Sequence, residues 1–119
     1  MIRTAVIGVG YLGRFHAQKY AALPNSRLVG IADPAPAARS AVAAELGVAA
    51  HADYRELLGS VDAVSIVTPT ASHYEVAKAF LEAGASVLVE KPMTVTIEEG
   101  ERLIDIAARA KRILQVGHL

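Results

Sequence analysis

The fold is decided by residues 5–13, which read Ala5-Val6-Ile7-Gly8-Val9-Gly10-Tyr11-Leu12-Gly13. A short apolar run leads into three glycines with the spacing G-x-G-x-x-G, and a helical pattern follows them. The run predicts a buried strand, and the glycines predict a tight turn from that strand into a helix. The amino end of such a helix presents unpaired N–H groups and a partial positive charge, which suit a phosphate. The stretch therefore predicts the phosphate-binding turn of a dinucleotide-binding domain.

Each glycine of this turn has its own mechanical role. Gly8 permits the tight turn off the strand, and Gly10 lacks the Cβ that would hold a pyrophosphate away from the backbone. Gly13 lets the helix pack close to the strand. Tyr11 and Leu12 lie between them at the start of the helix, so all five residues are expected to contact the cofactor.

Composition and charge are those of an ordinary globular domain. The chain has 119 residues, of which 53% are hydrophobic and 20% charged, and 12 basic residues balance 12 acidic ones. This supports one domain and argues against a nucleic-acid or membrane-surface partner. Cysteine is absent, which excludes a disulfide scaffold and a thiolate metal site. The sequence shows no signal-peptide pattern and no apolar run near the ~18 residues of a membrane span, so a cytoplasmic location is expected.

Strand and helix patterns alternate along the chain. Strands are expected at Thr4–Val9, Leu28–Ala32, Val48–Ala50, Ala63–Val67, Val87–Val89 and Ile113–Val116. Helices are expected at Tyr11–Leu23 and Pro36–Leu46, and after capping-box patterns that begin at Asp53, Ser72 and Thr96. Pro36 suits a first helical turn and Gly47 the left-handed residue past a helix end. In the last helix, Leu103, Ile104 and Ala107 are expected to form one apolar stripe.

The pattern of the strands predicts the fold class. Continuous apolar strands indicate burial on both faces and hence a parallel sheet. Right-handed crossovers then predict an α/β, doubly wound Rossmann fold of six strands in the order 3-2-1-4-5-6, over residues 1–119. Ligands of such a sheet bind beyond the carboxyl ends of the strands. The polar candidates at those ends are the glycine turn, Asp33, Thr68-Pro69 and Glu90-Lys91-Pro92.

Asp33 is the candidate sugar-binding residue. It follows the second strand and lies 20 residues after Gly13, the spacing of a carboxylate that accepts hydrogen bonds from the adenosine ribose. A 2′-phosphate would meet a like charge there, which favours NAD over NADP. Arg39 falls inside the second helix and is an unconvincing phosphate clamp. The alternative reading of Asp33 is a turn residue before Pro34.

Four motifs carry a resemblance to a known family. They are Gly8-x-Gly10-x-x-Gly13-x-x-His16, Thr68-Pro69-x-x-x-His73, Glu90-Lys91-Pro92 and Val116-Gly117-His118. Together they resemble the glucose-fructose oxidoreductase, inositol dehydrogenase and rhizopine-catabolism (Gfo/Idh/MocA) oxidoreductases over essentially the whole chain. The resemblance implies a Rossmann domain followed by a larger α/β domain with an open antiparallel sheet. It also implies hydride transfer between NAD(P) and a sugar, inositol or related polyol.

The resemblance implies roles for the motif residues. Lys91 would be catalytic, binding the reacting hydroxyl and assisting proton transfer, and Glu90 would lie near the nicotinamide. Thr68, Pro69 and His73 would line the cofactor cleft. A lysine partly desolvated beside a cationic nicotinamide has its charged form disfavoured, which suits acid–base work. The alternative for Lys91 is a solvated lysine at the start of a turn before Pro92. The alternative for Glu90 is that it is the ion-pair partner of Lys91.

The remaining histidines carry less information. His16, on the first helix, fits packing or an interdomain contact better than catalysis, and His73 either contacts the cofactor or packs in a capping turn. His51 is expected in an exposed loop, and His118 has no assigned role. No histidine–carboxylate spacing resembles a metal site, so no metal is expected.

The sequence departs from the family in length, because the second domain is missing from these 119 residues. We therefore expect an isolated domain that binds NAD(H) with little or no turnover, and an exposed sheet edge that invites self-association. One alternative is a non-catalytic nucleotide-binding or sensing module, which would not need Lys91. Another is a methyltransferase-like fold that binds S-adenosylmethionine, whose reversed strand is not signalled here.

Overall fold

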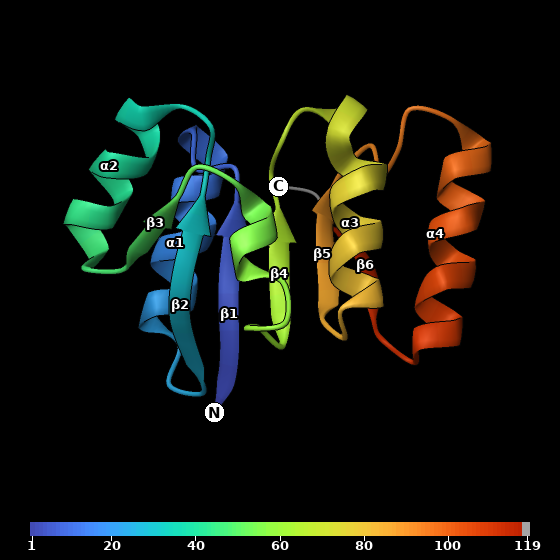
Figure 1. The fold of residues 1–119 in the computed structure, drawn as a ribbon, viewed down its shortest axis with the longest axis horizontal. Helices are drawn as coiled ribbons and strands as arrows, with labels where there is room; N and C mark the ends of the chain where they lie inside the picture. Colours follow the sequence, from blue (N-terminus) through green and yellow to red (C-terminus); the bar gives the residue numbers. More distant parts are fainter. Residues whose placement is uncertain (118–119) are drawn as a thin grey trace.

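Six strands form one parallel sheet in the order β3-β2-β1-β4-β5-β6 in the computed structural model, which describes residues 1–117 (Figure 1). The strands are β1 (Ile2–Ile7), β2 (Ser26–Ala32), β3 (Ala49–His51), β4 (Ala63–Ile66), β5 (Ser86–Glu90) and β6 (Leu114–Gly117). The helices are α1 (Tyr11–Ala22), α2 (Pro36–Leu46), α3 (His73–Glu82) and α4 (Ile97–Ala110), with single 3₁₀ turns η1 (Tyr54–Leu57) and η2 (Thr70–Ser72). The predicted fold class, strand direction and strand order are confirmed.

The strands begin and end within two residues of the predicted positions. The shift at β1 has a clear cause, because Gly8 takes a φ of +89° and so ends the strand at Ile7. Val9 therefore lies in the turn rather than in the strand. His51, predicted in a loop, is instead the last residue of β3.

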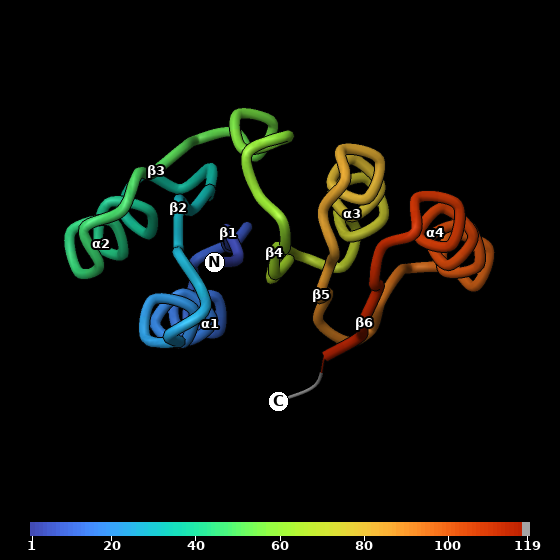
Figure 2. Tube along the Cα trace, turned by 90° about the horizontal axis from the view of Figure 1, so that it is seen from below, coloured from blue at the N-terminus to red at the C-terminus, as the bar shows by residue number. Residues whose placement is uncertain are grey.

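Two helical layers cover the two faces of the sheet, with α1 and α2 on one face and α3 and α4 on the other (Figure 2). The strand side chains alternate between these layers. In β1, Val6 packs in the cluster that contains Ala17 of α1, whereas Ile7 packs in the cluster that contains Phe80 of α3. This double burial is the reason why β1 is apolar at consecutive positions.

Several helix ends follow the chemistry expected from the sequence. Pro36 opens α2, and Gly47 ends it in the left-handed region with a φ of +65°. At α4, the side chain of Thr96 accepts a hydrogen bond from the N–H of Glu99 at 3.1 Å, which is half of the predicted capping box.

The capping box predicted at Ser72 is wrong. The Ser72 hydroxyl donates to Thr68 Oγ1 at 2.7 Å and lies 2.8 Å from the Pro69 carbonyl oxygen, so it does not cap α3. The reason is that η2 precedes α3 directly, which turns the serine back toward the end of β4. At η1, Asp53 accepts from the N–H of Arg55 at 2.9 Å and opens only one 3₁₀ turn.

The predicted stripe on α4 is narrower than expected. Leu103 and Ala107 are buried, but Ile104 is 59% exposed. Because neighbouring helical positions are about 100° apart, a residue directly after a buried one turns away from the core.

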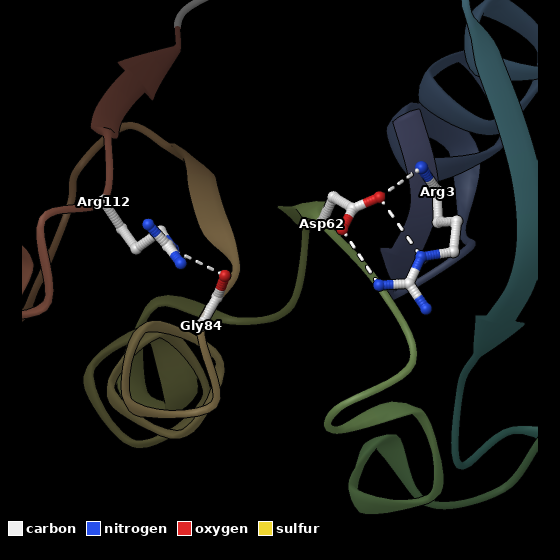
Figure 3. Close-up of polar contacts among 4 residues, drawn as sticks. All are labelled: Arg3, Asp62, Gly84 and Arg112. Atoms are coloured by element: carbon white, nitrogen blue, oxygen red, sulfur yellow. Dashed lines mark hydrogen bonds and ion pairs between the residues drawn. The ribbon is translucent and has the colours of Figure 1, made fainter. Parts of the chain in front are cut away.

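Polar contacts tie the strands together at their amino ends. Asp62, just before β4, accepts from the backbone N–H of Arg3 at 2.8 Å and from its guanidinium at 3.0 and 3.2 Å (Figure 3). Arg112, just before β6, donates to the carbonyl oxygen of Gly84 at 2.6 Å. These contacts fasten the edge opposite to the carboxyl ends, which leaves the carboxyl ends free to form a site.

Candidate functional site

A cavity of about 850 Å³ opens at the carboxyl ends of β1, β2 and β4. Five residues predicted to bind a cofactor line it: Gly8, Gly10, Asp33, Thr68 and Pro69. Four residues that were not predicted as cofactor contacts complete its polar wall: Asp53, Tyr54, Ser72 and Glu75. The cavity lies where the sheet order reverses between β1 and β4, which is the position expected for a ligand of this fold.

The glycine turn closes tightly on the protein and stays open toward the cavity. A Cβ on Gly8 would lie 2.6 Å from the Val67 carbonyl oxygen, and a Cβ on Gly13 would lie 1.7 Å from the Gly8 carbonyl oxygen. These two positions hold α1 against β1 and the end of β4. By contrast, a Cβ on Gly10 would meet nothing within 4 Å. Gly10 is therefore not needed by the fold itself, and its bare backbone leaves room for a ligand.

The amino end of α1 suits an anion. Gly10 is the N-cap and provides no side-chain hydrogen bond, and the first turn holds no acidic residue. The first N–H groups of the helix consequently lack a side-chain acceptor, and the helix dipole favours negative charge at this point. Together with the open space at Gly10, this end of α1 fits a pyrophosphate.

Asp33 is bonded directly to the glycine turn. One carboxylate oxygen accepts from the N–H of Val9 at 2.8 Å, and the other accepts from the N–H of Ala35 at 2.8 Å. Each oxygen keeps a second lone pair for a ligand hydroxyl. The turn-residue reading is also realised, since the bond to Ala35 is a local Asx turn. Asp33 thus serves the turn and faces the cavity.

Arg39 lies nearer to Asp33 than its place in α2 suggested. Its guanidinium donates to the carbonyl oxygens of Asp33 and Pro34 at 3.1 and 3.3 Å. The side chain folds back along the first turn of α2. Its position beside Asp33 was not visible in the spacing of the sequence.

The carboxylates of Asp53 and Glu75 also line the cavity, and that of Asp53 is paired with the guanidinium of Arg55 at 2.7 Å. Burial raises the pKa of Tyr54, and the negative charge of Glu75 raises it further. Tyr54 packs beside Phe80 with 6.0 Å between ring centroids. Sequence analysis missed Tyr54 and Glu75 as lining residues, since the capping-box patterns that contain them predict helix starts and not a binding site.

Other predicted site residues lie outside this cavity. Tyr11 is 79% exposed and Leu12 40% exposed on the outer side of α1. Glu90 is the last residue of β5 and Lys91 follows it, one strand further along the sheet than β4. His73 is 1% exposed, and both its ring nitrogens face backbone carbonyl oxygens, so it lies behind the cavity wall.

Lys91 is placed by its backbone. Its N–H donates to the carbonyl oxygen of Gly117 at 3.1 Å, which continues the β5–β6 ladder by one bond. Its side chain is exposed and makes no hydrogen bond or ion pair within residues 1–117. Glu90 lies against His16, at 2.8 Å, so the predicted alternative of a Glu90–Lys91 ion pair is wrong within the described residues.

Residues 1–117 hold neither a metal-binding cluster nor a membrane-spanning helix. No group of three or more histidine, cysteine, aspartate or glutamate side chains among residues 1–117 is arranged to hold a metal ion. In the same range, no helix combines the length and the apolar character that crossing a membrane requires. His118, which has no role from the sequence, lies outside the described residues.

Comparison with known proteins gives consistent matches over nearly the whole chain. A family model described as "Oxidoreductase family, NAD-binding Rossmann fold" (GFO_IDH_MocA) matches residues 2–118. UDP-N-acetylglucosamine 3-dehydrogenase of Acidithiobacillus ferrooxidans is 49% identical over 99% of the chain, and its structure superposes with a TM-score of 0.92 over 98% of the chain. The scyllo-inositol 2-dehydrogenase (NAD⁺) of Bacillus subtilis is 36% identical over 99% of the chain.

A solved structure with bound ligands is also similar. Scyllo-inositol dehydrogenase of Lactobacillus casei, with bound NAD(H) and scyllo-inositol, has 30% sequence identity and a TM-score of 0.90 over 98% of the chain. The chain spans 37% and 36% of the lengths of the two sequence relatives, and 38% and 36% of the two solved chains.

Proposed function

This chain belongs to the Gfo/Idh/MocA oxidoreductase family, whose model carries an NAD-binding Rossmann fold, and from that premise we propose that it is the cofactor-binding part of an NAD-dependent dehydrogenase. The proposed reaction moves a hydride between the nicotinamide ring and a hydroxyl-bearing carbon of a sugar, inositol or related polyol. A nucleotide-linked sugar and an inositol are the first substrates to test, since the named relatives act on such compounds.

One observation carries the cofactor assignment. The carboxylate of Asp33 is hydrogen-bonded to the N–H of Val9 inside the glycine turn, at 2.8 Å. The group that would hold the adenosine ribose and the turn that would hold the pyrophosphate are therefore one rigid unit, facing one cavity. A dinucleotide needs these two features at a fixed separation.

The same wall supports NAD as the preferred cofactor. Asp33 would accept hydrogen bonds from both ribose hydroxyls, whereas a 2′-phosphate would meet its negative charge. The guanidinium of Arg39 is already engaged with two carbonyl oxygens, which limits its use as a phosphate clamp.

Lys91 would handle the proton. Its side chain is exposed at the end of β5 and has no partner within residues 1–117, so its ammonium group is free to donate a hydrogen bond to a substrate hydroxyl. In the direction of oxidation, the neutral amine form of Lys91 would accept the hydroxyl proton and become the ammonium group, while the cofactor accepts the hydride.

Titration of the 119-residue chain with NADH, NADPH and S-adenosylmethionine tests the proposal. We expect NADH to bind more tightly than the other two, and we expect little or no turnover when NAD⁺ is supplied with scyllo-inositol or UDP-N-acetylglucosamine. Tighter binding of S-adenosylmethionine than of NADH would refute the dehydrogenase assignment. Rapid NADH production by this chain would refute the expectation that it needs further substrate-binding structure.

A further inference from the structure

Lys91 stands in a short segment, Glu90–Met93, that two histidines contact, His73 fully buried and His16 partly exposed. This segment begins at the last residue of β5, and it is the part of the proposed site that the cavity does not explain. His16 comes from α1 and His73 from α3, which cover opposite faces of the sheet (Figure 2). The two contacts fall on either side of Lys91 in the chain.

His73 joins the segment to the end of β4. It is 1% exposed; its Nε2 lies 2.8 Å from the Thr68 carbonyl oxygen, and its Nδ1 lies 3.0 and 3.1 Å from the carbonyl oxygens of Pro92 and Met93. Carbonyl oxygens only accept, so each contact is a hydrogen bond when the facing nitrogen carries a proton. The ring therefore lies between Thr68, which lines the cavity, and the two residues that follow Lys91.

His16 holds the residue before Lys91. Its Nε2 lies 2.8 Å from Oε1 of Glu90, and the two side chains are only 10% and 13% exposed. Both atoms are buried, and neither has a hydrogen-bond partner within residues 1–117. The two side chains are therefore in direct contact at ion-pair distance, without the geometry of a hydrogen bond.

A buried chain of hydroxyl groups orients His16. Its Nδ1 lies 3.0 Å from Oγ of Ser65, which is fully buried on β4, and the Ser65 hydroxyl lies 2.5 Å from the Tyr20 hydroxyl. Tyr20 can donate to Ser65, and Ser65 can donate to Nδ1, so this chain of hydroxyl groups holds the His16 ring with Nε2 on the side of Glu90.

We propose that His16 and His73 are positioning residues that fix the main chain on both sides of Lys91 from opposite faces of the sheet. The exposed ammonium group makes no hydrogen bond or ion pair within residues 1–117, so its location depends on how the residues on either side of it are held. The consequence for catalysis rests on the proposed function, whereas the anchoring itself is a property of the chain without any ligand.

Two pairs of variants test the anchors. His73→Phe and His16→Phe remove the ring nitrogens, and His73→Gln and His16→Gln keep one donor on a side chain of similar reach. The first readout is hydrogen exchange of the Lys91 amide, which donates to Gly117, in the absence of cofactor. We expect about tenfold faster exchange in the Phe variants and partial rescue in the Gln variants, since one hydrogen bond is removed or kept.

The second readout compares NADH with ADP-ribose, which lacks the nicotinamide. We expect the Phe variants to bind NADH about tenfold more weakly and ADP-ribose nearly as well as the unchanged chain. His51→Gln is the matched control, because His51 lies on β3 and contacts Glu56 rather than the Lys91 segment. It should leave exchange at Lys91 unchanged.

The outcomes distinguish the positioning role of His16 and His73 from the proposed function. Unchanged exchange at Lys91 in both Phe variants would overturn the positioning role, and so would an equal loss of NADH and ADP-ribose binding. If the unchanged chain fails to bind NADH, the proposed function is overturned, while the exchange experiment still decides whether the two histidines anchor Lys91. Should a Phe variant not fold, the Gln variant of the same histidine gives the decision.

Discussion

Asp33 is the residue on which cofactor choice depends most directly. Its carboxylate accepts one N–H from the glycine turn and one from Ala35, and it faces the cavity beside Asp53 and Glu75. We predict that Asp33→Ser weakens NADH binding and narrows the NADH-to-NADPH affinity ratio by about tenfold, because serine keeps a hydroxyl for hydrogen bonding and removes the charge that repels a 2′-phosphate.

The measurement is a pair of fluorescence titrations, with NADH and NADPH, on the unchanged and substituted chains. Asp105→Asn is a suitable control, since that carboxylate lies on α4 and pairs with Arg109 on the surface. An unchanged ratio in Asp33→Ser would show that the carboxylate does not contact the ribose.

Asp62 gives a prediction about pH that does not involve the site. Hydrogen bonds from the guanidinium and then from the backbone N–H of Arg3 lower the pKa of Asp62 from 3.8 to about 2. Since the folded value is below the unfolded one, the pair stabilises the fold fully above pH 3.8, and this contribution is lost as the pH falls through about 2.

The chain should therefore lose stability relative to Asp62→Asn across that window. Urea unfolding midpoints of both chains, measured between neutral pH and the lower end of the window, check this. Arg3→Gln should cause most of the loss of stability that Asp62→Asn causes at neutral pH. The double substitution should lower the free energy of unfolding by less than the sum of the two single substitutions. A constant difference between the chains at all pH values would contradict the assignment.

At the scale of elements, the turn between β1 and α1 contains one glycine that the fold requires, Gly13, and one that the fold does not require, Gly10. A Cβ at Gly13 would lie 1.7 Å from the Gly8 carbonyl oxygen, so Gly13→Ala forces α1 away from β1 and should destabilise the chain by about 2 kcal/mol. A Cβ at Gly10 meets nothing within 4 Å, so Gly10→Ala should change stability by less than about 0.5 kcal/mol.

Gly10→Ala should instead lower the affinity for NADH. In Gly10→Ala the new methyl group occupies the space proposed for the pyrophosphate, so NADH binding should fall sharply while the urea midpoint stays unchanged. Full NADH affinity in Gly10→Ala would show that the phosphates lie elsewhere.

The elements also show why sequence patterns succeed or fail. The pattern at Pro36 and Gly47 predicted α2 correctly, because those residues act through their own backbone geometry. The pattern at Ser72 failed, because the serine hydroxyl could bond to Thr68 and Pro69 instead. Local rules hold where a residue has one structural option, and they fail where tertiary neighbours offer another.

At the scale of the whole molecule, some site residues could likewise be predicted from the sequence, whereas others depend on tertiary packing. The strand order and the meeting of Gly10, Asp33, Thr68 and Pro69 followed from alternating strands and helices, since parallel strands bring their carboxyl ends together. The contacts of His16 and His73 could not be predicted, because each joins a helix to a segment far away in the sequence. Distances of that kind depend on how the layers pack, which sequence spacing does not encode.

The outer strand β6 leads to a prediction about assembly. It is paired only with β5 within residues 1–117, Val116 on it is 42% exposed, and Ile113 just before it is 69% exposed. Unpaired strand edges next to apolar side chains favour pairing with another chain.

We predict concentration-dependent self-association of the 119-residue chain, reduced in Val116→Lys because a charge at an edge strand opposes such pairing. Sedimentation velocity over a range of concentrations measures this. Ile97→Lys is the matched control, since Ile97 is 82% exposed on α4, away from β6. An equal effect of the two substitutions would indicate general surface stickiness, and a chain that stays monomeric at every concentration would remove β6 as an assembly edge.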